Sequence, residues 1–139
     1  MALYLQTLYE NAVRSFSTNA TDTRFAANFV TAVNFSLDEL SRCGHLTAAL
    51  AHIDATDSNV TGMDEEHSDI MAAGVAYHLM EMGHGMTARN GPALMDRALV
   101  RWELKQGDWM IDKSRDDQDD VDDDGNPEAD IIGLGYKSE

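Results

Sequence analysis

The chain is poor in the residues that build disulfides, helix kinks and cationic surfaces. Its 139 residues include one cysteine and two prolines, and 10 Lys and Arg stand against 25 Asp and Glu. The lone Cys43 excludes an intramolecular disulfide. We expect a half-buried structural thiol there, with a pKa lowered by Arg42 and His45 as the alternative. The shortage of cations argues against binding nucleic acid through its phosphates and against anionic membrane surfaces.

Several other signals are missing as well. No stretch approaches eighteen apolar residues, so we expect no membrane span. The N-terminus lacks the basic start and apolar block of a signal peptide, which favours an intracellular protein. We find no glycine-rich phosphate loop, nucleophile elbow or Cys–His pairing. The sequence therefore predicts neither an enzyme nor a cofactor.

The C-terminal part, residues 108–139, holds much of the negative charge. It contains 12 Asp and Glu against 3 Lys and Arg, a net charge of −9 out of −15 for the whole chain. Like charges extend such a segment, and a charge run alone is typical of a solvated tail. Here the acidic stretch leads to four large apolar side chains, which are too few to form a core and can be buried only against something else. We therefore interpret the segment as a tethered docking arm with a partner-binding tip: Ile131, Ile132, Leu134 and Tyr136.

Residues 1–107 are predicted to be helical, because proline is scarce, alanine is frequent and β-branched runs are short. Apolar residues at helical spacing predict helices over residues 3–16, 24–43, 64–82 and 92–107, and a short one over 45–53. Asp22 is a plausible N-cap for the second helix, and Gly44 is placed to end it. The predicted fold is all-α: a small antiparallel bundle of about four to five helices, followed by an extended acidic tail over residues 108–139.

The acidic segment contains the opening of a calcium-binding loop, D-x-D-x-D-G. Asp120, Asp122 and Asp124 supply alternating carboxylates, and the glycine allows a sharp turn. The rest departs from an EF-hand, because Pro127 stands at the eighth position and Ile131 stands where a bidentate glutamate belongs. Loose association of counterions is the favoured interpretation, and a calcium site remains the alternative.

Histidine and carboxylate pairs at helical spacing are candidate metal ligands. His78 and Glu81 are three residues apart and can meet on one helix face. Two ligands do not make a site, so we expect ordinary histidines and no bound metal.

A row of basic residues on the last predicted helix is the other candidate site. Arg97, Arg101 and Lys105 are spaced four apart, so they share one side of the helix. The simpler interpretation is a solvated face with Asp96 and Glu103 nearby. The functional interpretation is a docking strip for carboxylates of a neighbouring subunit or partner. A chain with an acidic arm and a basic strip can pair head to tail, and such contacts close into rings when the rotation allows.

The middle of the chain resembles the head-to-tail connector proteins of tailed bacteriophages, also called adaptor or head-completion proteins. The resemblance covers roughly residues 20–107 and rests on the pattern and order of segments. These segments are Leu37–Leu40, Asp54–Ser58, Met63–His67, Ala72–Leu79, Met82–Gly83 and Asp96–Trp102.

This resemblance implies a small helical domain that assembles as a homo-oligomeric ring beneath the portal, in the neck of the virion. Its partners would be the portal protein and tail or neck proteins, and a C-terminal segment commonly engages the portal. DNA would pass through the channel without sequence-specific contacts, and assembly would take place in the host cytoplasm. The aspartate run is not expected of the family. Two functions therefore stand as hypotheses, a structural connector and a calcium-binding interaction module.

Overall fold

The computed structural model describes residues 2–85 and 91–123, with side chains described up to residue 114. The chain divides into two compact units, residues 1–109 and 110–139, and the description below concerns the first unit unless α4 is followed further. The elements in chain order are β1 (Ala2–Tyr4), α1 (Leu5–Ser15), α2 (Thr23–Cys43), β2 (Asn59–Asp64), a 3₁₀ turn (Glu65–His67), α3 (Ser68–Glu81) and α4 (Gly91–Asp123). The prediction of a mainly helical fold is confirmed.

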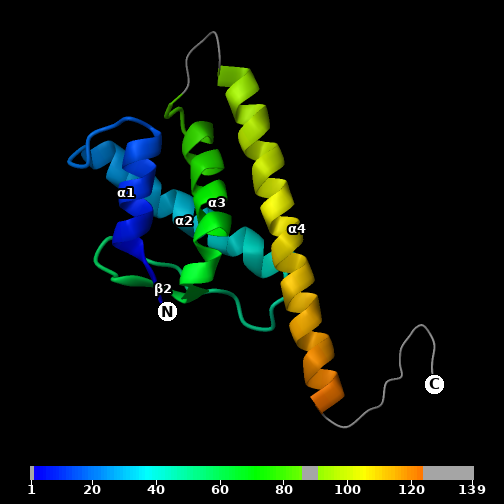
Figure 1. Cartoon of the computed structure of the whole chain (residues 1–139). Helices are drawn as coiled ribbons and strands as arrows, with labels where there is room; N and C mark the ends of the chain where they lie inside the picture. The colour runs from blue at the N-terminus through cyan, green and yellow to red at the C-terminus, as the bar shows by residue number, and fades with distance from the viewer. Residues whose placement is uncertain (1, 86–90, 124–139) are drawn as a thin grey trace. The chain divides into compact units, whose positions relative to one another are not determined.

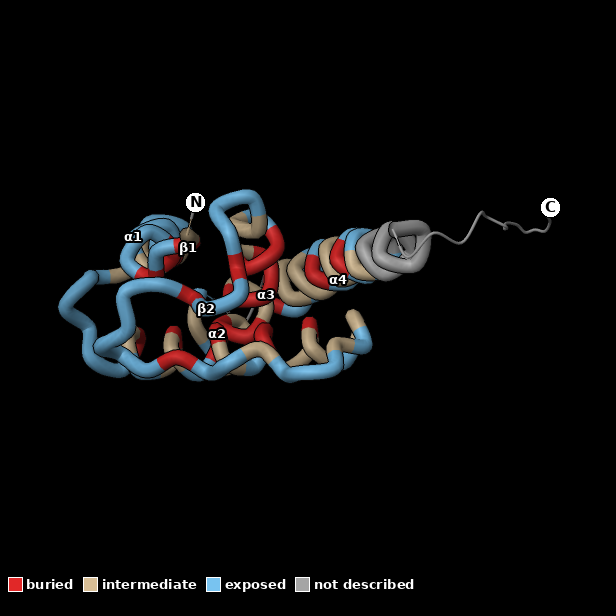
Figure 2. The backbone as a smooth tube through the Cα atoms, turned by 90° about the horizontal axis from the view of Figure 1, so that it is seen from below, coloured by how far each residue is buried: buried red, intermediate tan, exposed pale blue. Residues whose placement is uncertain are grey.

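The helices of the first unit form two layers. α1, α3 and the first part of α4 lie side by side, and α2 crosses beneath them (Figures 1 and 2). α1 and α3 run in the same direction, and α4 runs opposite to α3 (Figure 1). The antiparallel arrangement that we predicted for the bundle therefore describes the α3–α4 pair and not the whole domain.

Local signals set the two ends of α2. The Asp22 carboxylate accepts hydrogen bonds from the backbone N–H groups of Arg24 and Phe25 at 3.0 and 3.1 Å, as predicted for an N-cap. The helix ends at Cys43, with Gly44 as the C-cap. Between these ends, apolar residues at helical spacing are buried on one face: Phe25, Phe29, Ala32, Val33, Leu37 and Leu40.

α3 is the central helix of the domain. Its buried residues point in several directions around the helix, which explains why its sequence is apolar without a polar face. At Gly74 this helix lies close to two others. A Cβ atom there would lie 2.5 Å from Ser36 Oγ on α2 and 2.8 Å from the Trp102 ring on α4.

The short helix predicted over residues 45–53 does not form. The side chain of Asn34 on α2 takes both backbone groups of Ile53, accepting from its N–H at 2.8 Å and donating to its carbonyl at 3.0 Å. Ser41 Oγ likewise accepts from the N–H of Leu50 at 2.9 Å. These bonds satisfy the loop backbone without a helix, while Ile53 is still buried in the core.

A two-stranded antiparallel sheet was not predicted. β1 pairs with β2 with Ala2 opposite Asp64 and Tyr4 opposite Asn59. Leu3 of β1 is buried in the core, as are Val60 and Met63 of β2. The strands are short and fall on segments read as the start of one helix and a loop, so periodicity did not reveal them. α3 accordingly begins at Ser68 and not near Asp64.

The prediction that the last helix ends at Gly107 is wrong, because α4 continues to Asp123. A single glycine inside a helix costs only about 1 kcal/mol. Trp109, two residues later, is fully buried and donates its ring N–H to the carbonyl of Leu40 at 2.9 Å. Residues 108–123 are therefore helical and not an extended tail.

Substituting alanine at two helical glycines tests this packing. We expect Gly74→Ala to lower the free energy of unfolding by about 1–3 kcal/mol, because the methyl group displaces Ser36 or the Trp102 ring. Gly107→Ala is the matched control, since a Cβ there meets no atom within 4 Å. It should raise stability by about 0.5–1 kcal/mol through helix propensity. Urea unfolding measures both, and equal effects of the two changes would contradict the close approach.

Candidate interaction surface

The three basic residues that were predicted as a docking strip lie on α4. Arg97 and Arg101 are exposed, and Lys105 is half-buried. None of them has a hydrogen-bond or ion-pair partner among the residues whose side chains are described. The nearby acids Asp96 and Glu103 thus do not pair with them. We call Arg97, Arg101 and Lys105 the basic edge of α4.

The orientation of α4 is set by two tryptophans. Trp102 and Trp109 are seven residues apart, two helical turns, and both are buried against the other helices. Val100 and Leu104 lie on the opposite side of the helix and are 56% and 66% exposed. These two exposed apolar residues were not predicted from the sequence. The tryptophan spacing was the signal that could have identified the inward face.

A small pocket opens beside the basic edge, where α1, α3 and α4 meet. Its volume is about 120 Å³. α1 and α3 supply mostly apolar walls, and the α4 residue that lines it is Arg101. The lining from α1 and α3 includes Leu8, Ala12, Phe16, Ala72, Val75 and Ala76. We call this the α1–α3–α4 pocket.

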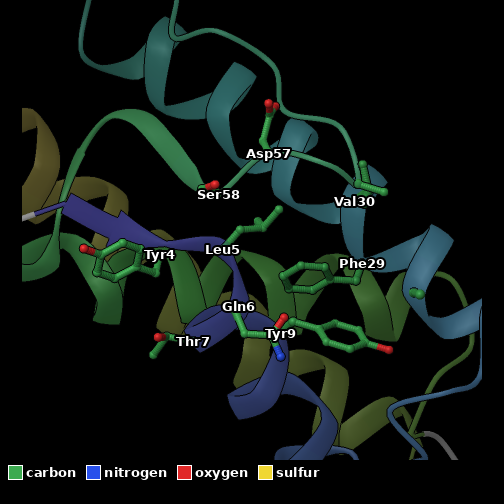
Figure 3. Close-up of a pocket in the computed structure, with 11 residues that line it drawn as sticks. Tyr4, Leu5, Gln6, Thr7, Tyr9, Phe29, Val30, Asp57 and Ser58 are labelled. Carbon is green, nitrogen blue, oxygen red and sulfur yellow. The ribbon is translucent and has the colours of Figure 1, made fainter.

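A larger cleft, of about 600 Å³, lies between the start of α1, α2 and the loop that precedes β2 (Figure 3). Leu5, Tyr9 and Phe29 give it an apolar interior. Asp57 is its charged lining residue, and its carboxylate accepts a hydrogen bond from the backbone N–H of Asp54 at 2.9 Å. No lysine or arginine is among the residues that line it.

A partly buried hydrogen-bond network joins α2, α3 and α4. The two ring nitrogens of His78 lie 2.7 Å from Glu39 Oε1 and 2.8 Å from Glu81 Oε1. The same oxygen of Glu39 accepts from the Trp102 ring N–H at 2.8 Å. The predicted meeting of His78 and Glu81 is confirmed. An imidazolium can donate to both carboxylates, whereas a neutral ring donates to only one.

Tyr77 lies at the edge of this network and has a raised pKa. Tyr77 donates its hydroxyl to Glu81 Oε2 at 3.1 Å. Partial burial, followed by this hydrogen bond to Glu81, raises the pKa of Tyr77 above its ordinary value. The tyrosine therefore stays neutral and holds the carboxylate that in turn contacts His78.

Cys43 behaves as the structural thiol that we expected. It is half-buried at the end of α2, and its thiol lies 3.7 Å from the carbonyl of Leu40. Burial raises the pKa of Cys43, and this outweighs the lowering effect of Arg42. The alternative of an activated thiolate is therefore wrong.

The other predicted site residues have no described geometry. Ile131, Ile132, Leu134, Tyr136 and Asp124 lie outside the described residues, and Asp120 and Asp122 lie in the part of α4 whose side chains are not described. Within the described part, Asp64, Glu66 and His67 form an exposed group with ligand-type atoms within 4.8 Å of one another. His67 Nδ1 already accepts the Asp64 backbone N–H at 2.9 Å, which makes this group a helix cap.

Comparisons with protein-family models, curated proteins and solved structures found no match to this chain. Within the described residues, none of the helices is both long and apolar enough to cross a membrane.

Removing the shared acceptor tests the buried network. Glu39→Ala leaves the Trp102 ring N–H and one nitrogen of His78 without their acceptor. We expect a loss of about 1–3 kcal/mol in the free energy of unfolding. Glu103→Ala, at an exposed position on the same helix as Trp102, should change stability by less than about 0.5 kcal/mol. Similar losses for both variants in urea unfolding would rule out a supporting role for the network.

The raised pKa of Cys43 gives a second prediction. Because the thiolate is the reactive form, Cys43 should be alkylated by iodoacetamide at pH 8 more slowly than free cysteine. Its rate should approach that of free cysteine once the chain is unfolded in urea. Mass spectrometry of the single thiol follows the reaction, and faster alkylation in the folded chain would contradict the assignment.

Proposed function

We propose that this chain is a structural, ring-forming head-to-tail connector that joins the portal to the tail of a tailed bacteriophage around the DNA exit channel. One observation carries the proposal: the basic edge of α4 has no partner among the described side chains, although residues 108–139 of the same chain carry a net charge of −9. The identity of the partners follows from the sequence resemblance described above.

Complementary charges on different parts of one chain favour heterologous contacts between copies. In such a contact one surface of a subunit binds a different surface of the next, and repetition closes a ring when the rotation permits. The exposed Val100 and Leu104 beside the basic edge add apolar area to the surface that would be covered. We therefore propose a homo-oligomeric ring in the neck of the virion.

The net charge of −15 is consistent with a passage for DNA. An acidic channel wall repels phosphates, so the duplex slides without binding. The proposal includes portal and tail or neck proteins as partners and no sequence-specific contact with DNA. It assigns no catalytic role to the chain.

The C-terminal arm would supply the interlocking contact, to the portal or to a neighbouring subunit. Its apolar end carries Ile131, Ile132, Leu134 and Tyr136, and the acids Asp124, Glu128 and Asp130 precede this end in the residues after α4. A calcium-binding role for Asp120, Asp122 and Asp124 is the alternative function, and the experiment below separates the two.

Truncation after Asp123 tests the role of the arm. A cut after Gly107 would remove the buried Trp109, whereas a cut after Asp123 keeps every described helix and strand. We expect the truncated chain to keep its helical circular dichroism and melting temperature but to lose oligomerisation in native mass spectrometry, at least tenfold in assembled fraction.

The matched variant keeps the full length and changes only the tip, with serine at Ile131, Ile132 and Leu134. It should fail to assemble like the truncated chain, because the loss of apolar burial and not of length is responsible. Unimpaired assembly by both variants would remove the docking role of the arm. A monomeric full-length chain with one calcium ion, lost on chelation, would instead favour the ion-binding module.

A further inference from the structure

We propose that the α1–α3–α4 pocket is the receptor for the C-terminal arm of a second copy of this chain, with Ile131 in the pocket and Asp130 paired with Arg101. This inference rests on the proposed function in one respect, that copies of the chain lie next to one another. It assigns the arm a specific acceptor within the subunit.

The pocket has the size and lining for one aliphatic side chain. Its volume of about 120 Å³ is slightly below that of the roughly 150 Å³ apolar cavity that takes a benzene molecule. Leu8 and Ala12 from α1 and Val75 and Ala76 from α3 form most of an apolar interior. A branched side chain such as that of Ile131 would fill this space and would no longer be exposed to water.

The positive charge of Arg101 at the rim determines which group can bind next to that aliphatic side chain. Arg101 lines the pocket and has no partner among the described side chains. Arg14 on α1 is different, because its guanidinium donates to Asn11 Oδ1 at 3.1 Å. A guanidinium without a partner beside an apolar pocket fits a carboxylate next to an aliphatic group, and Arg–carboxylate pairs are among the stronger charge-assisted hydrogen bonds.

The arm presents that combination in consecutive residues. Asp130 directly precedes Ile131, and Glu128 adds a second carboxylate two residues earlier. The long-range charges agree, since residues 124–139 carry four acids against one lysine, a net charge of −3, and are attracted to the basic edge of α4. Neighbouring residues thus supply both the apolar group for the pocket and the anion for Arg101.

Charge also distinguishes this pocket from the larger cleft in Figure 3. That cleft is roomier, but among its described lining residues the charged one is Asp57 and none is a cation. An arm with a carboxylate next to its apolar tip would meet a like charge there, which disfavours binding. The smaller pocket beside Arg101 is therefore the better acceptor.

A peptide titration tests the pocket with the full-length chain. The receptor carries Asp130→Lys, so that its own arm does not compete for Arg101, and the probe is a fluorescent peptide of residues 124–139 read by anisotropy. Adding Arg101→Glu to the receptor should weaken binding at least tenfold. Arg97→Glu is the matched control, because Arg97 is exposed on the same basic edge but does not line the pocket, and it should weaken binding less than threefold.

Charge reversal on the peptide gives the reciprocal result. A peptide with Asp130→Lys should prefer the Arg101→Glu receptor, and a peptide with Ile131→Asp should bind neither receptor well. Equal effects of Arg101→Glu and Arg97→Glu would reduce the contact to general charge attraction and overturn the assignment. Absence of binding up to millimolar peptide would overturn it as well.

Mixing two full-length variants separates a second copy from the chain's own arm. Arg101→Glu and Asp130→Lys chains should each associate poorly, and their mixture should form mixed oligomers in native mass spectrometry. If the double variant regains assembly while the mixture does not, the arm binds its own subunit and the proposal fails. A wild-type ring unaffected by Arg101→Glu would leave the connector function standing and remove this inference. If the peptide binds but the chain forms no ring, this inference would stand and the connector function would be removed.

Discussion

One carboxylate oxygen ties the core of this protein together. Glu39 Oε1, on α2, lies within hydrogen-bond distance of both His78 on α3 and Trp102 on α4. The rings of His78 and Trp102 are buried, and buried polar groups are tolerated only when their partners are present, so the three helices have to meet in one relative placement. That placement determines which side of α4 faces outward. The positions of the basic edge and of Arg101 in the small pocket depend on it. A partly buried polar contact between three helices thereby helps to determine the exposed side of α4.

The parts of the fold that could be predicted are those governed by neighbours in the sequence. Asp22 caps α2 and Gly44 ends it, because capping depends on a few adjacent residues. The pairing of His78 with Glu81 also follows from spacing, because Glu81 lies one turn later on the same helix. The basic edge of α4 was visible for the same reason, since residues four apart share a side of any helix.

The rest depended on contacts between distant segments. Asn34 forms hydrogen bonds to the backbone of Ile53, where a helix had been predicted. No residue near Ile53 in the sequence indicates these bonds. Gly107 looked like a helix end until the burial of Trp109 outweighed its poor propensity. The small pocket is equally non-local, because its lining comes from three helices that are far apart in the sequence and Arg101 lines it only after they have packed.

The position of the two tryptophans near the end of the first unit has a consequence for synthesis. α3 is apolar around much of its circumference, and the side that Trp102 covers stays open until that part of the chain has left the ribosome. Chains that expose apolar helices during synthesis are prone to association with the wrong partner. A chain that stops before Trp102 therefore leaves this side of α3 without its cover.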